Sequence, residues 1–197
     1  MVEKSQSTHM SLKDIIKKWR TKGAIAPSSR FLVNKMLSKI DYAQDLDILQ
    51  LGFGNGVFTK EIIRRSSANS TLTIFEVDKD CGKYKLDNKK ITYIEDSAEK
   101  ISLYFEDKKF DHVISTLPFA SLQREVSQKI FKEIKQHLKN NGKFLQFQYS
   151  LFSRKDFNKL CKEKPKIDFV LLNLPPAFIY ETTKYSENKV SKKLIVG

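Results

Sequence analysis

The segment DILQLGFGNGVFTKEI, residues 47–62, decides the fold of this chain. Asp47–Leu51 is an apolar run of strand length, and apolar residues recur at helical spacing over Gly56–Arg65. Three glycines lie between and at the start of these stretches, at alternate positions: Gly52, Gly54 and Gly56. Glycine permits a tight turn and lets backbone N–H groups approach a ligand closely. A buried strand, a glycine turn and a helix predict the first β–α unit of an open sheet, with a ligand site at the turn.

The rest of the chain alternates short apolar runs with helical spacing. We expect further strands at Leu72–Val77, Ile91–Glu95, His112–Thr116, Lys143–Tyr149, Phe169–Leu174 and Phe178–Thr182. We expect further helices from Ser28 or Ser29, around Ser97–Phe105, at Leu122–Leu138 and at Lys155–Cys161. Strands that alternate with helices predict an α/β, Rossmann-like, mostly parallel sheet. The last two strands meet at NLPPA, residues 173–177, without a helix between them, which predicts a terminal antiparallel hairpin.

Composition places the chain among globular proteins of reducing compartments. Its 197 residues, 40% hydrophobic and 30% charged, suit a domain with a real core. No apolar run approaches the ~20 residues that a membrane-spanning helix needs, and the N-terminus shows no secretory pattern. Cys81 and Cys161 are isolated, which disfavours a disulfide framework. We therefore expect a cytoplasmic protein, and no residue cluster predicts a metal site.

A formal net charge of +13 is the strongest compositional signal. Such a charge favours a polyanionic partner, either nucleic acid or an anionic membrane surface. A surface solvated by abundant lysine explains the charge equally well. Charge alone leaves these alternatives open.

Polar residues follow the next two strands at the points where each strand ends. Glu76 ends the second strand, where a carboxylate can bind both hydroxyls of a ribose. Asp96 and Ser97 follow the third strand, where they can contact an adenine edge. Together with the glycine turn, these residues predict a nucleoside site at the carboxyl ends of the first three strands.

With these motifs, residues 28–184 resemble the class I S-adenosylmethionine-dependent methyltransferases. The resemblance implies a seven-stranded sheet that ends in a hairpin, with S-adenosyl-L-methionine as cofactor and S-adenosyl-L-homocysteine as product. It implies that the cofactor is bound by Gln50, Gly52, Phe53, Gly54, Gly56, Glu76, Val77, Asp96, Ser97, Ala98 and Ser115. Gln50 departs from the family, which usually has an acid two positions before the first glycine. A neutral amide supplies no charge for the methionine ammonium, so we expect a weakened or altered contact.

Four further segments carry a narrower resemblance: GAIAPSSRFL at 23–32, STLPFASL at 115–122, FLQFQYS at 144–150 and NLPPAFIY at 173–180. Together they resemble the small soluble bacterial phospholipid N-methyltransferases, which convert phosphatidylethanolamine stepwise to phosphatidylcholine. In that family a basic amphipathic helix precedes the catalytic fold and binds anionic membrane. The resemblance implies an N-terminal arm over residues 1–22, a methyltransferase domain over 23–197, and a location on the inner face of the cell membrane. No protein partner is evident.

The segment SLKDIIKKWR, residues 11–20, independently predicts such a helix. Its apolar residues have helical spacing and share one face: Leu12, Ile15, Ile16 and Trp19. Basic residues flank or oppose that face, among them Lys17 and Lys18, and tryptophan favours a membrane interface. We expect reversible membrane binding; the alternative is a helix that packs on its own domain as a lid.

The methyl acceptor is expected to lie at the loop Ser115–Phe119 after the fourth strand and at Tyr149 after the fifth. Ser115, Thr116 and Tyr149 are the candidates for orienting an amine and passing its proton to water. Aromatic faces of Phe119, Tyr149 or Tyr180 can hold a methylated ammonium by cation–π attraction, although core packing explains Phe119 and Tyr180 equally well. Arg30 is a candidate for the lipid phosphate or a solvated helix residue. We expect His112 and His137 to be structural.

Two alternatives remain open. TLPF, residues 116–119, is similar to the Asn-(Leu/Ile)-Pro-(Tyr/Phe) motif of ribosomal RNA adenine dimethylases, and the charge suits RNA. Thr116 stands where those enzymes have asparagine, which disfavours this reading. The other alternative is a membrane-binding relative that has lost turnover, with Gln50 as its sign.

Overall fold

The computed structural model describes Asp14 and residues 28–149 and 164–184. In this part of the chain, seven strands form one sheet in the order β3-β2-β1-β4-β5-β7-β6. The strands are β1 (Asp47–Leu51), β2 (Thr71–Phe75), β3 (Ile91–Ile94), β4 (Phe110–Ser115), β5 (Leu138–Gln148), β6 (Lys166–Val170) and β7 (Ala177–Thr183). β7 is antiparallel to both its neighbours, and the other strand pairs are parallel. The predicted fold class is confirmed.

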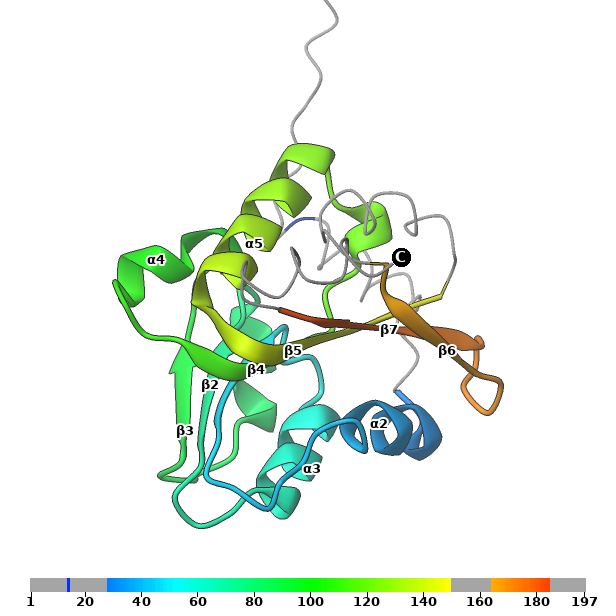
Figure 1. Cartoon of the computed structure of the whole chain (residues 1–197), viewed down its shortest axis with the longest axis horizontal. Coiled ribbons are helices and arrows are strands. Elements are labelled where there is room, and N and C mark those ends of the chain that lie inside the picture. Colours follow the sequence, from blue (N-terminus) through cyan, green and yellow to red (C-terminus); the bar gives the residue numbers. More distant parts are fainter. Residues whose placement is uncertain (1–13, 15–27, 150–163, 185–197) are drawn as a thin grey trace, which may run out of the picture.

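Helices cover both faces of the sheet, with α2 and α3 on one side and α4 and α5 on the other (Figure 1). The α-helices are α2 (Arg30–Leu37), α3 (Val57–Arg65), α4 (Ile101–Tyr104) and α5 (Arg124–His137). Short 3-10 helices are η1 (Lys79–Tyr84), η2 (Ala98–Lys100) and η3 (Phe119–Ser121). Because both faces are covered, central strands form continuous buried runs rather than alternating patterns, as in β1, whose last four residues are all buried.

Two apolar cores result from this layering. One lies on the α5 side and includes Phe110, Ile130 and Phe144. The other lies on the side of α2 and α3 and includes Met36 and Ile62. The sheet between them is therefore fixed from both sides, which holds the strand ends in place.

The sequence-based bounds of the sixth strand are wrong. We expected Phe169–Leu174, but β6 spans Lys166–Val170, and residues 171–176 form the loop to β7. The mostly apolar run FVLLNL continues past the end of β6, so hydrophobicity does not show where the strand ends and the loop begins. Pro175 and Pro176 lack the N–H groups that a longer strand would need. β5 also begins earlier than expected, at Leu138, with a register shift between Phe110 and His112 on its partner β4. The expected helix Lys155–Cys161 lies outside the described residues.

Helix α2 and the residues that flank it are joined to the β6–β7 hairpin by hydrogen bonds and ion pairs. The contacts are Ser29 N to Asn173 Oδ1 (2.9 Å), Lys35 Nζ to the Phe169 carbonyl (3.0 Å), and Lys39 Nζ to Asp168 and to Glu181 Oε2, the latter at 3.1 Å. Burial opposes the charge of Lys39, but the two carboxylates outweigh it and raise the pKa of this ammonium. The hairpin and α2 therefore form one unit.

Strand direction puts the β6–β7 loop at the same edge of the sheet as the glycine turn. β5 runs parallel to β4 and β1, and Gln148 near the end of β5 pairs with Phe178 at the start of β7. Sheets of this kind bind ligands at the carboxyl edge, where the strand order reverses, here between β1 and β4. The topology thus selects this edge as the candidate site.

We expect His112 to make the fold sensitive to acid. Burial lowers the pKa of His112, with Asp111 opposing that shift and Lys143 and Lys139 adding to it. Its contribution to stability is therefore complete above the unfolded pKa of about 6.5 and is lost as pH falls through the folded pKa. In a His112→Asn variant, which keeps an acceptor for the Lys143 N–H, thermal melting should change less between about pH 7.5 and about pH 5.5. An equal pH dependence in variant and wild type would contradict this assignment.

Candidate active site

The glycine turn after β1 has a backbone that disfavours other residues. Gly52, Gly54 and Gly56 have φ of 85°, 60° and 75°, in the left-handed region. A Cβ on Gly52 would lie 2.6 Å from Thr116 Oγ1, whereas a Cβ on Gly54 would meet no atom within 4 Å. Gly52 is thus required by contact with the loop after β4, and the space beside Gly54 is open to a ligand.

Glu76, directly after β2, holds the glycine turn in shape. Its Oε2 accepts hydrogen bonds from Phe53 N (2.8 Å) and Gly54 N (3.3 Å), and its Oε1 accepts one from Asp78 N (2.9 Å). The carboxylate is 8% exposed. Glu76 therefore lies at the glycine turn. A ribose hydroxyl bound by Glu76 would use the same carboxylate oxygens that accept these three backbone N–H groups.

Gln50 is fully buried and has both ends of its amide engaged. Nε2 donates to the Gly52 carbonyl (2.8 Å), and Oε1 accepts from Thr59 Oγ1 on α3 (2.9 Å). The side chain therefore joins β1, the glycine turn and α3. A glutamine suits this position because it donates at one end and accepts at the other.

A small hollow that is open to solvent lies beside the glycine turn. Its lining includes Phe53, Glu76, Cys81, Tyr93 and Glu95. The rings of Phe53 and Tyr93 meet edge to face, with centroids 5.5 Å apart. An aromatic wall beside a carboxylate and an open glycine fits a nucleoside, so these residues suit the predicted cofactor.

The residues after β3 form a capped turn. Ser97 Oγ accepts from Glu99 N (3.2 Å) at the start of η2, and Ala98 is buried. Asp96 accepts from Lys100 Nζ (2.9 Å) and from Tyr104 Oη (2.9 Å). Lys100 is the largest cause that lowers the pKa of Asp96, so this carboxyl is ionised at neutral pH. Adenine contacts by Asp96 and Ser97 stay a prediction.

The loop after β4 lies between β1 and β5. Ser115 is fully buried and its Oγ accepts from Leu117 N (3.3 Å). Thr116 Oγ1 donates to the Gly52 carbonyl (3.1 Å). On the other side, Gln146 Nε2 donates to the Leu117 carbonyl (2.9 Å). The predicted acceptor loop is therefore in direct contact with the glycine turn.

Three buried polar atoms at the end of β5 have no hydrogen-bond partner among the described residues: Gln146 Oε1, Gln148 Nε2 and Tyr149 Oη. Burial raises the pKa of Tyr149, and the neighbouring Asn173 amide opposes the shift without completing a well-formed hydrogen bond. Buried polar groups without partners are costly unless a ligand meets them. Sequence analysis missed both glutamines, although glutamine within the apolar run FLQFQY was a visible signal.

Tyr149 is not joined to Ser115 or Thr116 by any described contact. Its ring packs edge to face on Phe147 (centroids 5.6 Å apart), in the core on the α2 side. Ser115 pairs with Gln146 in the sheet, so these two side chains share a face. The structure thus brings Ser115, Thr116 and Gln146 together and leaves Tyr149 on the other side of β5.

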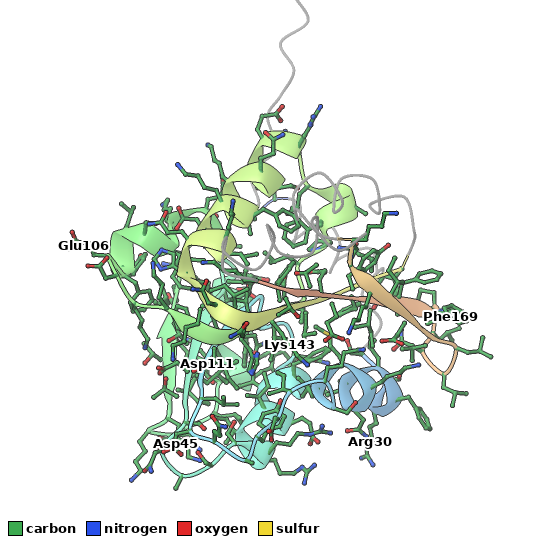
Figure 2. All side chains as sticks on the ribbon, viewed as in Figure 1. Arg30, Asp45, Glu106, Asp111, Lys143 and Phe169 are labelled. Carbon is green, nitrogen blue, oxygen red and sulfur yellow. The ribbon has the colours of Figure 1, made fainter. Side chains whose placement is uncertain are left out.

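Two other predicted substrate residues are core residues. Phe119 is 6% exposed and packs on Phe131, with ring centroids 4.7 Å apart. Tyr180 on β7 is fully buried in the same core. Packing, the alternative that the sequence left open, accounts for both in this arrangement. Arg30 is exposed at the start of α2, and Val77 packs against the core on the α5 side (Figure 2).

Histidines have structural contacts. His137 is fully buried, with Nδ1 2.8 Å from the Lys108 carbonyl and Nε2 3.1 Å from Ser102 Oγ. His112 Nδ1 accepts from Lys143 N within the sheet. Among the described residues, no group of acidic, histidine and cysteine side chains is arranged to hold a metal ion.

The predicted membrane helix lies outside the described residues, so its side chains are not placed: Leu12, Ile15, Ile16, Lys17, Lys18 and Trp19. Over residues 28–149 and 164–184, no helix is long and apolar enough to span a bilayer.

Known proteins share this architecture. Residues 48–142 match the family model described as a methyltransferase domain. An ornithine lipid N-methyltransferase from Singulisphaera acidiphila is 26% identical over 169 residues, covering 80% of this chain and 85% of that protein. Among solved structures, an rRNA methylase from Streptococcus thermophilus aligns with a TM-score of 0.61 at 14% identity, covering 82% of this chain and 100% of that one. The N-methyltransferase NodS from Bradyrhizobium japonicum aligns with a TM-score of 0.59 at 11% identity, covering 78% and 94%.

Residues 48–142 therefore match a methyltransferase domain, and the fold is that of the class I methyltransferases, whose cofactor is S-adenosylmethionine. Within that class, the chain is similar in sequence to a lipid N-methyltransferase. The predicted cofactor and class are confirmed.

We expect Gly54→Ala to weaken cofactor binding while preserving the fold. The added methyl group would enter the open space at the turn, and the left-handed backbone costs alanine only about 1–2 kcal/mol. S-adenosylmethionine affinity, measured by calorimetry, should fall about tenfold or more, which is about 1.4 kcal/mol or more. Gly82→Ala is the matched control, because Gly82 also has no atom within 4 Å of its Cβ position and lacks a positive φ. Unchanged affinity in Gly54→Ala would exclude the turn as the cofactor site.

We expect Gln50→Glu to destabilise the protein rather than to tighten cofactor binding. A buried carboxylate would replace the donor to the Gly52 carbonyl with an acceptor, at a cost of about 1–3 kcal/mol. Thermal melting should fall, and cofactor affinity should fall or stay unchanged. Tighter binding with unchanged melting would instead show that an acidic side chain can be accommodated here to bind the methionine ammonium.

Proposed function

We propose that this protein transfers methyl groups from S-adenosylmethionine to the primary amine of a membrane lipid head group. The first substrate is phosphatidylethanolamine, followed by its monomethyl and dimethyl derivatives, with phosphatidylcholine as the final product. The observation that carries the proposal is the similarity to a lipid N-methyltransferase over 80% of the chain. The excess of positive charge, +13, supports an anionic membrane as the place of reaction.

The chemistry requires alignment and loss of a proton. S-adenosylmethionine supplies an electrophilic methyl group, and the amine must present its lone pair in line with it. A primary ammonium has a pKa of about 10, so the site has to stabilise the ammonium and then release its proton to water. Gln146 Oε1, which has no hydrogen-bond partner among the described residues, is the candidate acceptor beside the loop after β4. This acceptor orients one N–H bond.

Tyr149 is the remaining candidate for proton transfer. Burial raises the pKa of this phenol, so the hydroxyl stays protonated at neutral pH and can both accept and donate. The hydroxyl has no hydrogen-bond partner among the described residues. Because Tyr149 packs on the α2 side of β5, away from Ser115 and Gln146, its hydroxyl can take part only when the amine is bound at that side of the strand.

An ornithine lipid is the second candidate substrate. The relative from Singulisphaera acidiphila is named for methylation of that lipid. Ornithine lipids and phosphatidylethanolamine both present a primary amine at the membrane surface, so the same acceptor would serve either. Neither the glycine turn nor the loop after β4 distinguishes these head groups.

Two observations favour a lipid amine over an adenine of RNA. Thr116 Oγ1 already donates to the Gly52 carbonyl, where the RNA enzymes have an asparagine amide. Phe119, at the position of their base-stacking aromatic residue, is packed on Phe131. A base could stack on Phe119 only after this core contact opened.

The proposal is tested by offering labelled S-adenosylmethionine with three acceptors in parallel. These are vesicles of phosphatidylethanolamine with phosphatidylglycerol, vesicles of ornithine lipid with phosphatidylglycerol, and total ribosomal RNA. We expect label in phosphatidylethanolamine and its methylated products. Label in RNA alone would overturn the proposal. Cofactor binding without any transfer would favour a relative that has lost turnover.

Tyr149→Phe should lower kcat about tenfold or more without weakening S-adenosylmethionine binding, since proton transfer by a side chain contributes about a hundredfold or more. Tyr42→Phe is a matched control, because Tyr42 Oη is also buried without a partner but lies between α2 and β1. Equal activity in the two variants would exclude Tyr149 from the reaction.

A further inference from the structure

The loop between β6 and β7, residues 171–176 with the sequence LLNLPP, exposes three leucines to solvent. The exposed fractions are 68% for Leu171, 63% for Leu172 and 83% for Leu174. Phe169, at 48%, precedes the loop, and Phe31 on α2 is 59% exposed. Exposed apolar side chains that gather in one place mark an interaction surface.

The loop has a single polar side chain, Asn173, and that side chain is hydrogen-bonded within the protein. Asn173 is 4% exposed; it accepts from Ser29 N and donates to the Pro175 carbonyl (2.7 Å). Pro175 and Pro176 have no N–H groups. Since unsatisfied N–H and C=O groups are costly in hydrocarbon, this composition lowers the cost of placing the loop tip among lipid chains.

The leucines lie at the carboxyl edge of the sheet, which also carries the glycine turn. Val170 and Ala177 pair at the base of the hairpin loop, and Gln148 at the end of β5 pairs with Phe178. The bond from Ser29 to Asn173 places the start of α2 against the same loop. Figure 1 shows the hairpin projecting beside α2. The expected membrane arm precedes α2 in the sequence.

Charges around the leucines complement an anionic surface. Residues 171–180 contain no charged side chain. Arg30 and Lys35 on α2 are exposed, and Lys35 Nζ donates to the Phe169 carbonyl. Arg30 and Phe169 occur on the same side of the molecule, where α2 meets β6 (Figure 2). The carboxylate of Asp168 is paired with Lys39. An apolar tip beside cations favours anionic lipid over an acidic or neutral protein surface.

We propose that the 171–176 loop inserts its three leucines into the anionic membrane that carries the substrate, with Arg30 and Lys35 at the head groups. The inference rests on the proposed function for the identity of the membrane. The loop would be a second point of attachment to the membrane, in addition to the N-terminal arm. Its insertion would turn the carboxyl edge of the sheet toward the lipid. A second attachment restricts the orientations that a single amphipathic helix would allow.

The test is vesicle sedimentation of the full chain without cofactor. The probe is vesicles of phosphatidylglycerol and phosphatidylethanolamine in equal parts, with phosphatidylcholine vesicles as a neutral reference. The variant is Leu171→Ser/Leu172→Ser/Leu174→Ser. The matched control is Leu103→Ser on α4, since Leu103 is 78% exposed and lies far from the hairpin (Figure 1). We expect the triple variant to lose affinity for the anionic vesicles about tenfold or more, because partial burial of three leucines is lost, and Leu103→Ser to bind as wild type does.

Several results would overturn the inference. Unchanged sedimentation of the triple variant would exclude insertion of the loop, as would an equal loss in Leu103→Ser or absence of wild-type binding to anionic vesicles. Loss of a dimer in the triple variant, seen by analytical ultracentrifugation without a change in vesicle affinity, would assign the surface to a second copy of this chain. If the triple leucine variant lowered sedimentation only when Leu12, Ile15 and Trp19 are present, the loop would instead be a binding site for the N-terminal arm. Leucine-dependent sedimentation without methyl transfer to lipid would refute the proposed function and leave this inference standing.

Discussion

The hydrogen bonds from the Phe53 and Gly54 amides to Glu76 are the contact on which the candidate site depends. They join the end of β1 to the end of β2 and hold three glycines in left-handed conformations. Gln50 braces the same turn from within the sheet through Thr59 and the Gly52 carbonyl. Two buried side chains with complementary hydrogen bonds thus keep the turn open on its ligand side. The side chain at position 50 supports the turn instead of supplying charge to a ligand.

Sequence analysis predicts the central strands well and the edge hairpin poorly. β1 has the expected bounds because burial on both faces gives a continuous apolar run that ends at a glycine. In the hairpin, the same kind of run continues past Val170 into a solvent-exposed loop, so hydrophobicity alone cannot locate the end of β6. The place of Glu76 beside the glycine turn follows from chain order, because it comes directly after β2; its contact with a ribose stays a prediction.

Residues whose role depends on packing were harder to assign. Phe119 and Tyr180 were equally compatible with a substrate site or a core, and only the contacts with α5 and β5 place them in the core. Gln146 was missed because its candidacy as a site residue depends on the neighbours of the two ends of its amide. Nε2 bonds the Leu117 carbonyl, and Oε1 has no partner among the described residues. Such information is absent from spacing and composition.

The contact between Gly52 and Thr116 has a consequence for the binding of two ligands. Thr116 belongs to the loop expected to receive the methyl acceptor, and its hydroxyl bonds the backbone of the turn expected to receive the cofactor. Any coupling that this contact provides is reciprocal: the cofactor changes the affinity for the acceptor by the same factor by which the acceptor changes the affinity for the cofactor. A substitution at Gly52 acts on both elements, because an added Cβ would lie 2.6 Å from Thr116 Oγ1.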